Sequence, residues 1–143
     1  MSDENSNEKA IQIVNKMYRH DAFSQFLGIL IEEVKPGKVK LSMQVKREFT
    51  NGFKVAHGGI TYSLADSALA FASNGHGKHA LSIETSISHT KPVFEGDQLT
   101  AITEELVNTR TLGIYHIKVI NQMNEMVAIF KGTVYKKEKE WEI

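Results

Sequence analysis

The segment Gly58–Asn74 limits how this chain can fold more than any other part of its sequence. It reads GGITYSLADSALAFASN, contains no proline and predicts one long helix. Its apolar residues, among them Ile60, Leu64 and Phe71, lie on nearly every side of that helix. A helix that is apolar on most sides is buried, and its alanines and serines let other backbone segments approach it closely.

The sequence on either side of this helix predicts strands. Pro36-Gly37 separates an Ile- and Leu-rich run from an alternating one, which is typical of two strands joined by a tight turn. After the helix, every second residue from Leu81 to His89 is expected to share one face of a further strand. The predicted strands are residues 28–34, 39–45, 81–89, 99–107, 112–120 and 126–135. The charged run 136–140 is expected to be solvated surface.

Runs of strands around a single long helix, without alternating strand–helix–strand units, indicate an α+β fold with an antiparallel sheet. Because that helix must be buried, the sheet is expected to curl around it. The chain of 143 residues is expected to form one domain, 1–143, without repeat or linker. A shorter helix is expected at 8–20, capped by Asn7, and residues 1–7 are expected to be frayed.

Composition excludes several classes of function. The chain has 17 Lys+Arg and 17 Asp+Glu, a balance that favours neither nucleic acid nor an anionic membrane as a partner. It has no cysteine, which rules out disulfides, thiolate metal sites and a cysteine nucleophile. No signal-peptide pattern is present. No apolar run reaches the ~20 residues that a membrane-spanning helix needs. We therefore expect a cytoplasmic protein that does not enter the membrane.

The middle of the predicted buried helix holds a carboxylate, Asp66. Aspartate competes with the backbone for hydrogen bonds in a helix, and an ionised carboxylate is costly to bury without a partner. In a structural interpretation, Asp66 faces solvent or pairs with a lysine or a histidine. In a functional interpretation, it lines a cleft in which burial adjusts its pKa for chemistry.

The tripeptide His57-Gly58-Gly59 precedes the helix and favours the functional interpretation. Free N–H groups at a helix N-terminus bind anions, and an oxyanion hole requires such donors. At 1.5 Å per residue, however, Asp66 lies roughly 12 Å along the axis from Gly58. A second subunit related by a two-fold axis would place the carboxylate of one chain against Gly58 of the other.

These residues also carry a resemblance to a known family. Asn51, His57-Gly58-Gly59, Ala65-Asp66, the strand from Ser82 to Ser88, Lys91-Pro92, Gly96-Asp97 and Arg110-Thr111-Leu112 occur in the order found in one family. Over roughly residues 20–137 the chain resembles the PaaI-type, phenylacetate-degradation branch of the hotdog thioesterases. The resemblance implies a hotdog fold, an antiparallel sheet wrapped around the central helix, with subunits that pair edge to edge into homodimers and usually into homotetramers.

The resemblance also implies a substrate and a set of roles. The substrate would be an acyl-CoA thioester with an aryl-acetyl or medium-chain acyl group, hydrolysed to free acid and CoA without a further cofactor. Asp66 would be the nucleophile or the general base, Gly58 would supply the oxyanion N–H, and His57 would shape that turn. Asn51 would hold the thioester or the water from the opposite subunit, and Ser82 would place a hydroxyl near the carboxylate.

Further residues are expected to contact the substrate. Tyr62, Leu69 and Ser73 are candidates for the acyl pocket, together with residues of the partner subunit near Phe53. Lysine and arginine are favoured for contacts to the CoA phosphates, so Lys78, Lys91 and Arg110 are candidates there. The complete set of predicted substrate-binding residues is Gly59, Tyr62, Phe53, Leu69, Ser73, Thr85, Lys91 and Arg110.

Other sites are not indicated. His76 and His79 lie in a glycine-rich loop without nearby carboxylates, and no H-E-x-x-H motif occurs, so no metal site is predicted. His89 and His116 lie in predicted strands and are interpreted as packing or surface residues. No G-x-S-x-G motif signals a serine hydrolase.

Two alternative functions stay open. A non-catalytic acyl-CoA-binding or regulatory module on the same fold would be expected to lack Asp66 or Asn51, and both are present. A hotdog hydratase typically pairs an acidic residue with a histidine on the helix or its entry loop. The helix after Gly59 carries Asp66 but no histidine, which makes this alternative the weaker one.

Overall fold

The computed structural model of the chain describes residues 2–143. In this part of the chain, the helices are α1 (Asp3–Arg19), α2 (Ala22–Phe26) and α3 (Gly58–Asn74), and Arg47–Phe49 forms a short 3-10 turn, η1. The strands are β1 (Leu30–Lys35), β2 (Lys38–Gln44), β3 (Lys78–His89), β4 (Gln98–Asn108), β5 (Leu112–Ile120) and β6 (Met126–Glu140). None of these helices is long and apolar enough to cross a membrane.

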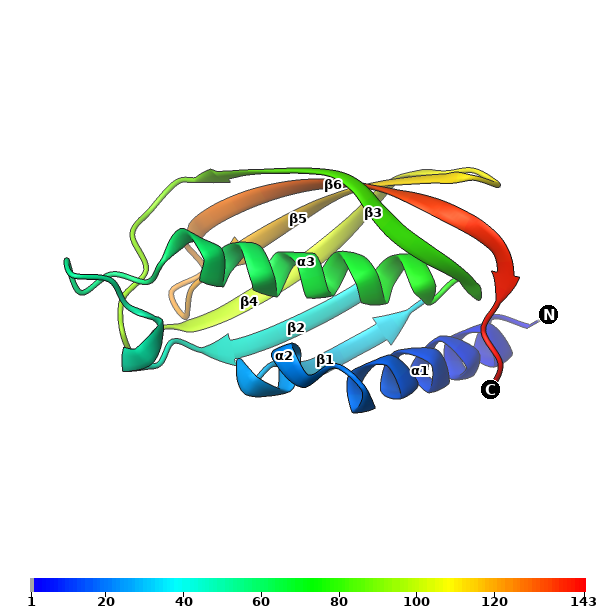
Figure 1. Ribbon diagram of the computed structural model, residues 1–143, viewed down its shortest axis with the longest axis horizontal. Coiled ribbons are helices and arrows are strands. Elements are labelled where there is room, and N and C mark those ends of the chain that lie inside the picture. The colour runs from blue at the N-terminus through cyan, green and yellow to red at the C-terminus, as the bar shows by residue number, and fades with distance from the viewer. Residues whose placement is uncertain (1) are drawn as a thin grey trace.

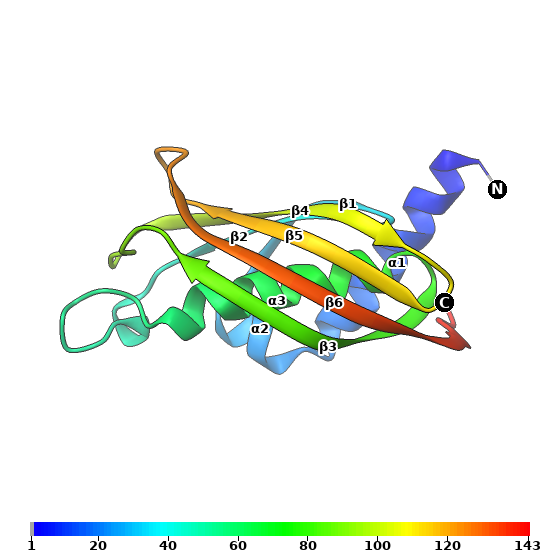
Figure 2. The same ribbon diagram turned by 90° about the horizontal axis from the view of Figure 1, so that it is seen from above.

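The strands form one antiparallel sheet in the order β1-β2-β4-β5-β6-β3. Helix α3 runs along the concave face of this sheet and touches β2, β3, β4, β5 and β6 (Figure 1). Seen from above, the sheet lies across α3 as one continuous layer (Figure 2). The predicted α+β architecture, with an antiparallel sheet curled around one buried helix, is confirmed.

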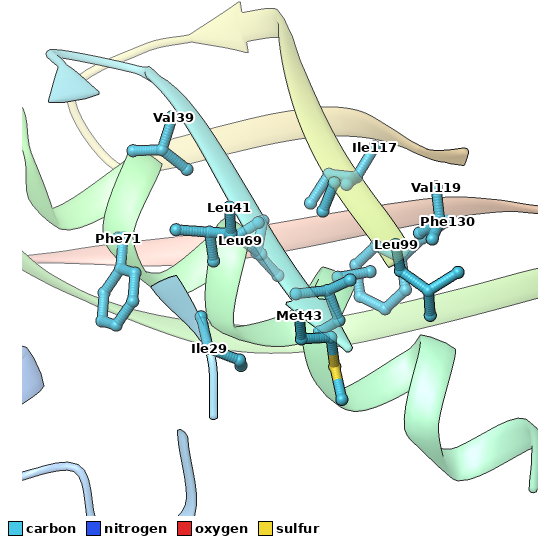
Figure 3. Close-up of a cluster of buried hydrophobic side chains, with 14 of the residues drawn as sticks. Ile29, Val39, Leu41, Met43, Leu69, Phe71, Leu99, Ile117, Val119 and Phe130 are labelled. Atoms are coloured by element: carbon cyan, nitrogen blue, oxygen red, sulfur yellow. The ribbon is translucent and has the colours of Figure 1, made fainter. Parts of the chain in front are cut away.

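The core lies between α3 and the sheet. Leu69 and Phe71 of α3 meet Leu41, Leu99 and other strand residues in one cluster of buried side chains (Figure 3). Strand β6 passes the helix very closely, because a Cβ atom on Gly132 would lie only 2.5 Å from Cδ2 of Leu69. A larger residue at Gly132 would push the sheet away from the helix.

The residues of strand β3 that face the helix are not the predicted ones. Ser82 pairs with Val134, but Glu84 already pairs with Thr133, so the register shifts between Ser82 and Glu84. Such a β-bulge sets two residues of one strand against one of the other and reverses the alternation. The expectation that every second residue from Leu81 to His89 shares one face is therefore wrong.

The bulge brings together two hydroxyl side chains. Opposite residues of an antiparallel pair lie on the same face, so Ser82 shares the helix side with the buried Val134. Thr85 pairs with Gly132 on that same side. Ile83, within the bulge, is 61% exposed. Ser82 and Thr85 thus both face α3, although they are three positions apart in sequence.

Both ends of the chain are more ordered than predicted. Helix α1 begins at Asp3 and not at Glu8, because the side chain of Ser2 accepts the N–H of Asn5 at 3.3 Å and acidic residues occupy the first turn. The predicted cap, Asn7, lies inside the helix, and residues 2–7 are not frayed; Met1 lies outside the described residues.

Strand β6 continues to Glu140, beyond the predicted end at Tyr135. Its last part pairs with the start of β3, where Ala80 lies opposite Lys136. Lys136 is buried, and its Nζ donates to the carbonyl of Thr109 at 2.9 Å, so the expectation of a wholly solvated run at 136–140 is wrong. Burial lowers the pKa of Lys136, and the nearby carboxylate of Glu105 opposes this effect.

Candidate active site

The first turn of α3 offers unused backbone donors. The loop before it is tied down by Thr50–Ala56 and Val55–Phe94 bridges, and His57 N–H donates to the carbonyl of Phe49 at 2.9 Å. His57 is the N-cap residue, but its side chain makes no capping bond. Within residues 2–143, the N–H groups of Gly58 and Gly59 have no hydrogen-bond acceptor. A carbonyl oxygen or an anion can therefore bind there.

Asn51 organises the loop that leads to this turn. Its Oδ1 accepts the N–H of Phe53 at 2.8 Å and that of Val55 at 3.4 Å. Its amide nitrogen makes no hydrogen bond to any described residue, so it is available to a ligand. Phe53 belongs to this loop and is 89% exposed, and the loop projects beyond the sheet (Figure 2).

A hollow of about 340 Å³ opens beside the N-terminus of α3. Its lining residues are Val55, Ala56, His57, Gly58, Thr61, His89, Thr90, Lys91, Pro92 and Val93. His89, interpreted from sequence as a packing or surface residue, forms part of this wall. It is the last residue of β3 and lies opposite the buried Ala128 of β6, on the helix side of the sheet, and no sequence motif around His89 signals this.

Asp66 lies in a second hollow, of about 180 Å³. Its lining residues are Asp66, Leu69, Ala70, Ser73, Ala80, Leu81, Ser82 and Val134. The structure thus brings the predicted catalytic residues Asp66 and Ser82 together with the predicted pocket residues Leu69 and Ser73. Ser82 lies just before the bulge of β3, on the helix side of the sheet that borders this hollow.

The pKa of Asp66 is raised above the usual value of an aspartate. Partial burial is the main cause, because it disfavours the charged form, and the negative charge of Asp21 is the second. Asp21 caps α2, a short helix that the sequence analysis did not predict, and accepts both the N–H and the hydroxyl of Ser24. Ser24 is in turn 2.8 Å from the hydroxyl of Ser67, the neighbour of Asp66.

One protomer does not unite these two hollows. In the part of the chain that the structure describes, no residue lines both the hollow at Gly58 and the hollow at Asp66. Between them, the hydroxyl of Tyr62 lies 2.7 Å from Oγ1 of Thr85, and the Tyr62 ring packs edge-on against Phe130 with centroids 5.4 Å apart. The predicted substrate contacts Tyr62 and Thr85 are therefore bonded to each other at the boundary.

Basic residues gather around a third hollow, of about 370 Å³, beyond the C-terminal end of α3. Lys9, Lys78, Arg110 and Lys136 line it, together with His76, Ser73 and Glu140. Ser73 also lines the hollow of Asp66, so the two adjoin. Arg110 pairs with Glu138 at 3.2 Å, and its side chain is largely exposed.

Lys91 lies elsewhere. It belongs to the hollow at Gly58 and pairs with Glu125. The structure therefore does not bring Lys91 and Arg110, both predicted to contact substrate, into one hollow of the protomer. Among residues 2–143, no three His, Asp or Glu side chains are grouped to hold a metal ion.

Comparison with known proteins places the chain in a family. The pattern of the thioesterase superfamily matches residues 53–128. A putative esterase of Archaeoglobus fulgidus is 41% identical over 95% of this chain and 91% of its own length. The acyl-coenzyme A thioesterase PaaI of Escherichia coli is 37% identical over 87% of this chain and 89% of its own.

Solved structures agree with the sequence relatives. The structure of the E. coli PaaI protein from the phenylacetic acid degradation operon superposes with a TM-score of 0.92 at 34% identity, covering 94% of this chain and 97% of that one. A hypothetical thioesterase from Streptococcus pneumoniae, solved with coenzyme A, superposes with a TM-score of 0.82 at 25% identity, covering 88% and 98%. The chain therefore has the predicted hotdog fold and belongs to the thioesterase superfamily, as a homologue of PaaI.

Proposed function

We propose that this protein hydrolyses acyl-CoA thioesters to the free acid and CoA. The observation that carries the proposal is a half-buried carboxylate, Asp66, that shares a hollow with Ser82 and lies on the same helix whose first N–H groups, at Gly58 and Gly59, have no acceptor among the described residues. Thioester hydrolysis needs these two elements, because one polarises the carbonyl and the other supplies or activates the nucleophile.

The names of the relatives support the substrate class. The E. coli relative is an acyl-CoA thioesterase from the phenylacetic acid degradation operon, and the pneumococcal one was solved with coenzyme A. A human relative, 27% identical over 78% of this chain, is acyl-coenzyme A thioesterase 13. We therefore favour CoA thioesters of aryl-acetyl or medium-chain acids.

The chemistry follows from the two elements. The thioester carbonyl oxygen accepts the N–H of Gly58, and the oxygen of a water or of Asp66 attacks the carbonyl carbon. The electron pair of the C=O bond moves to the oxygen, and its return expels the CoA thiolate. If water attacks, Asp66 accepts its proton; if Asp66 attacks, water later cleaves the acyl-aspartyl anhydride and restores the carboxylate.

The two elements belong to opposite subunits of a homodimer in this proposal. Strand β3 is an edge of the sheet, and an edge strand can pair with a copy of itself. A two-fold axis beside the bonded pair Tyr62 and Thr85 brings Gly58 opposite Asp66 of the partner subunit, since both lie four positions from Tyr62. Pairing of the two β3 strands also joins the sheets of both subunits into one unbroken sheet. Two such dimers would form the expected tetramer.

The CoA phosphates are assigned to the basic hollow. Lys9, Lys78, Arg110 and Lys136 supply positive charge there, and Ser73 connects this hollow to that of Asp66. Phosphate oxygens form strong charge-assisted hydrogen bonds with such side chains. Lys91 lies in the hollow at Gly58, apart from these basic residues, so it is the weaker candidate for this role.

We predict that Asp66→Asn lowers kcat by at least about 100-fold, because a positioned acid–base group is removed. CoA release from phenylacetyl-, benzoyl- and straight-chain acyl-CoA, followed with a thiol-reactive dye, measures the effect. Asp3→Asn, an exposed change on α1, is the control. Near-full activity of Asp66→Asn would remove this carboxylate from the mechanism, and wild-type binding of acyl-CoA without hydrolysis would favour a binding module.

The raised pKa of Asp66 predicts a pH dependence. The carboxylate works when ionised, so kcat/KM should fall as the pH drops through the raised pKa, at a higher pH than for an ordinary aspartate. Asp21→Asn removes one of the two causes but keeps a residue that can cap α2, so the falling limb should move to lower pH. In the control Glu8→Gln, the falling limb of the pH profile should stay in place. If it also stays in place in Asp21→Asn, the role of Asp21 is contradicted.

A shared site predicts complementation between inactive variants. Gly58→Pro removes the N–H at a helix position that tolerates proline, although the exposed His89 ring must move aside. Mixed with Asp66→Asn and reassociated, it should regain about one quarter of wild-type activity, because half of the dimers hold one intact site. No recovery in confirmed mixed dimers would place Gly58 and Asp66 of one site in the same subunit.

The basic hollow predicts a selective change in KM. Arg110→Ala should raise the KM for CoA thioesters about three- to tenfold, the scale of one charge-assisted contact, and leave kcat nearly unchanged. A thioester of N-acetylcysteamine, which lacks the phosphates, should show no such change. Lys118→Ala on the outer face of β5 is the matched control. Equal effects on both thioesters would contradict the assignment.

A further inference from the structure

The single tryptophan of the chain, Trp141, is stacked on His79. The two ring centroids are 4.1 Å apart, and the ring planes are tilted by only 11°. The backbone N–H of Trp141 donates to the carbonyl of Gly77 at 2.8 Å, and its indole Nε1–H donates to Oδ1 of the buried Asn74 at 2.9 Å. These bonds fix the indole at the C-terminal end of α3, and the imidazole lies flat against it.

This pair of rings adjoins the basic hollow. Lys78 and Glu140 line that hollow, and they are the chain neighbours of His79 and Trp141. Gly77, which accepts the N–H of Trp141, lines it as well. The backbone segments that carry the two rings therefore form part of the wall of the hollow, and both ring residues are partly exposed.

The surroundings of the imidazole suit an anionic nucleotide. Partial burial is the main cause that lowers the pKa of His79, so the ring is neutral at neutral pH. Nearby positive charges lower this pKa further, and they belong to Lys139, Lys137 and Lys16, while Glu142 acts in the opposite sense. The stacked pair thus has lysines beside it in addition to the basic residues of the hollow.

Aromatic rings next to positive charge are a common platform for a nucleotide, because the base stacks on the rings and the phosphates meet the charges. Coenzyme A carries such a nucleotide at one end, with an adenine ring and phosphate groups on one ribose. If the phosphates of CoA occupy the basic hollow, the adenine must lie close to its rim.

We propose that the stacked pair of His79 and Trp141 binds the adenine ring of CoA, with the base lying flat on the imidazole of His79 on the side away from Trp141. The inference rests on the proposed function, because it assigns a site to one part of the same substrate. The indole holds the imidazole in place from behind, so the platform is formed before the nucleotide binds. The adenine adds a third ring to the stack.

The test measures the binding of CoA and of phosphopantetheine, which is CoA without its adenosine part, by isothermal titration calorimetry. We expect His79→Ala to raise the Kd of CoA about tenfold, the scale of one base stacked on one aromatic side chain. His79→Phe keeps a flat ring and should stay within about threefold of the wild type. His116→Ala, at an exposed position of β5, is the matched control and should bind CoA like the wild type.

Phosphopantetheine separates stacking from other effects of the substitution. It has no adenine, so its Kd should be the same in the wild type, His79→Ala and His79→Phe. Because Trp141 is the single tryptophan, unchanged emission from unliganded His79→Phe also checks that the indole has kept its place.

Three results would overturn the inference. They are wild-type affinity of His79→Ala for CoA, equal losses in His79→Ala and His79→Phe, and a loss that extends equally to phosphopantetheine. The proposed function fails separately: protein that binds CoA through His79 but hydrolyses no thioester would refute the hydrolysis and leave the adenine site in place.

Discussion

The packing of α3 into the concave face of the sheet is the constraint on which the rest of the structure depends. Small residues make it possible: Ala65, Ala68 and Ala72 are fully buried on the helix, and Gly132 lets β6 come within reach of Leu69. The helix is thereby enclosed on most sides, and its apolar surface leaves water. Each polar group on the enclosed helix requires a partner or a function.

Within residues 2–143, the first N–H groups of this helix and the carboxylate of Asp66 lack a full set of partners, and both suit thioester chemistry. The N–H groups of Gly58 and Gly59 have no acceptor among the described residues, and Asp66 is half-buried with a raised pKa. A carboxylate whose pKa is higher in the folded than in the unfolded state stabilises the fold when protonated. Its ionisation at neutral pH therefore costs stability, and we interpret this cost as the consequence of an active carboxylate.

The sequence predicts the fold better than it predicts the site. Helix α3 and strand β5 have the predicted bounds, because the apolar pattern of each is strong and its ends are marked by turn residues. The bulge near Ile83 has no such mark, since it arises from the pairing of β3 with β6. For the same reason, the approach of His89 to Gly58 is a property of the curved sheet and not of the local sequence. The roles of the site residues stay predictions.

In the proposed dimer, one active site combines Gly58 of one chain with Asp66 of the other. The most direct test is a crystal structure of Asp66→Asn, which preserves the shape of the site, with uncleaved phenylacetyl-CoA bound. We expect a dimer joined along β3, with the thioester oxygen on the N–H of Gly58 and the side chain at position 66 of the partner subunit against the carbonyl carbon. A thioester bound away from Gly58, or a site formed within one chain, would contradict it.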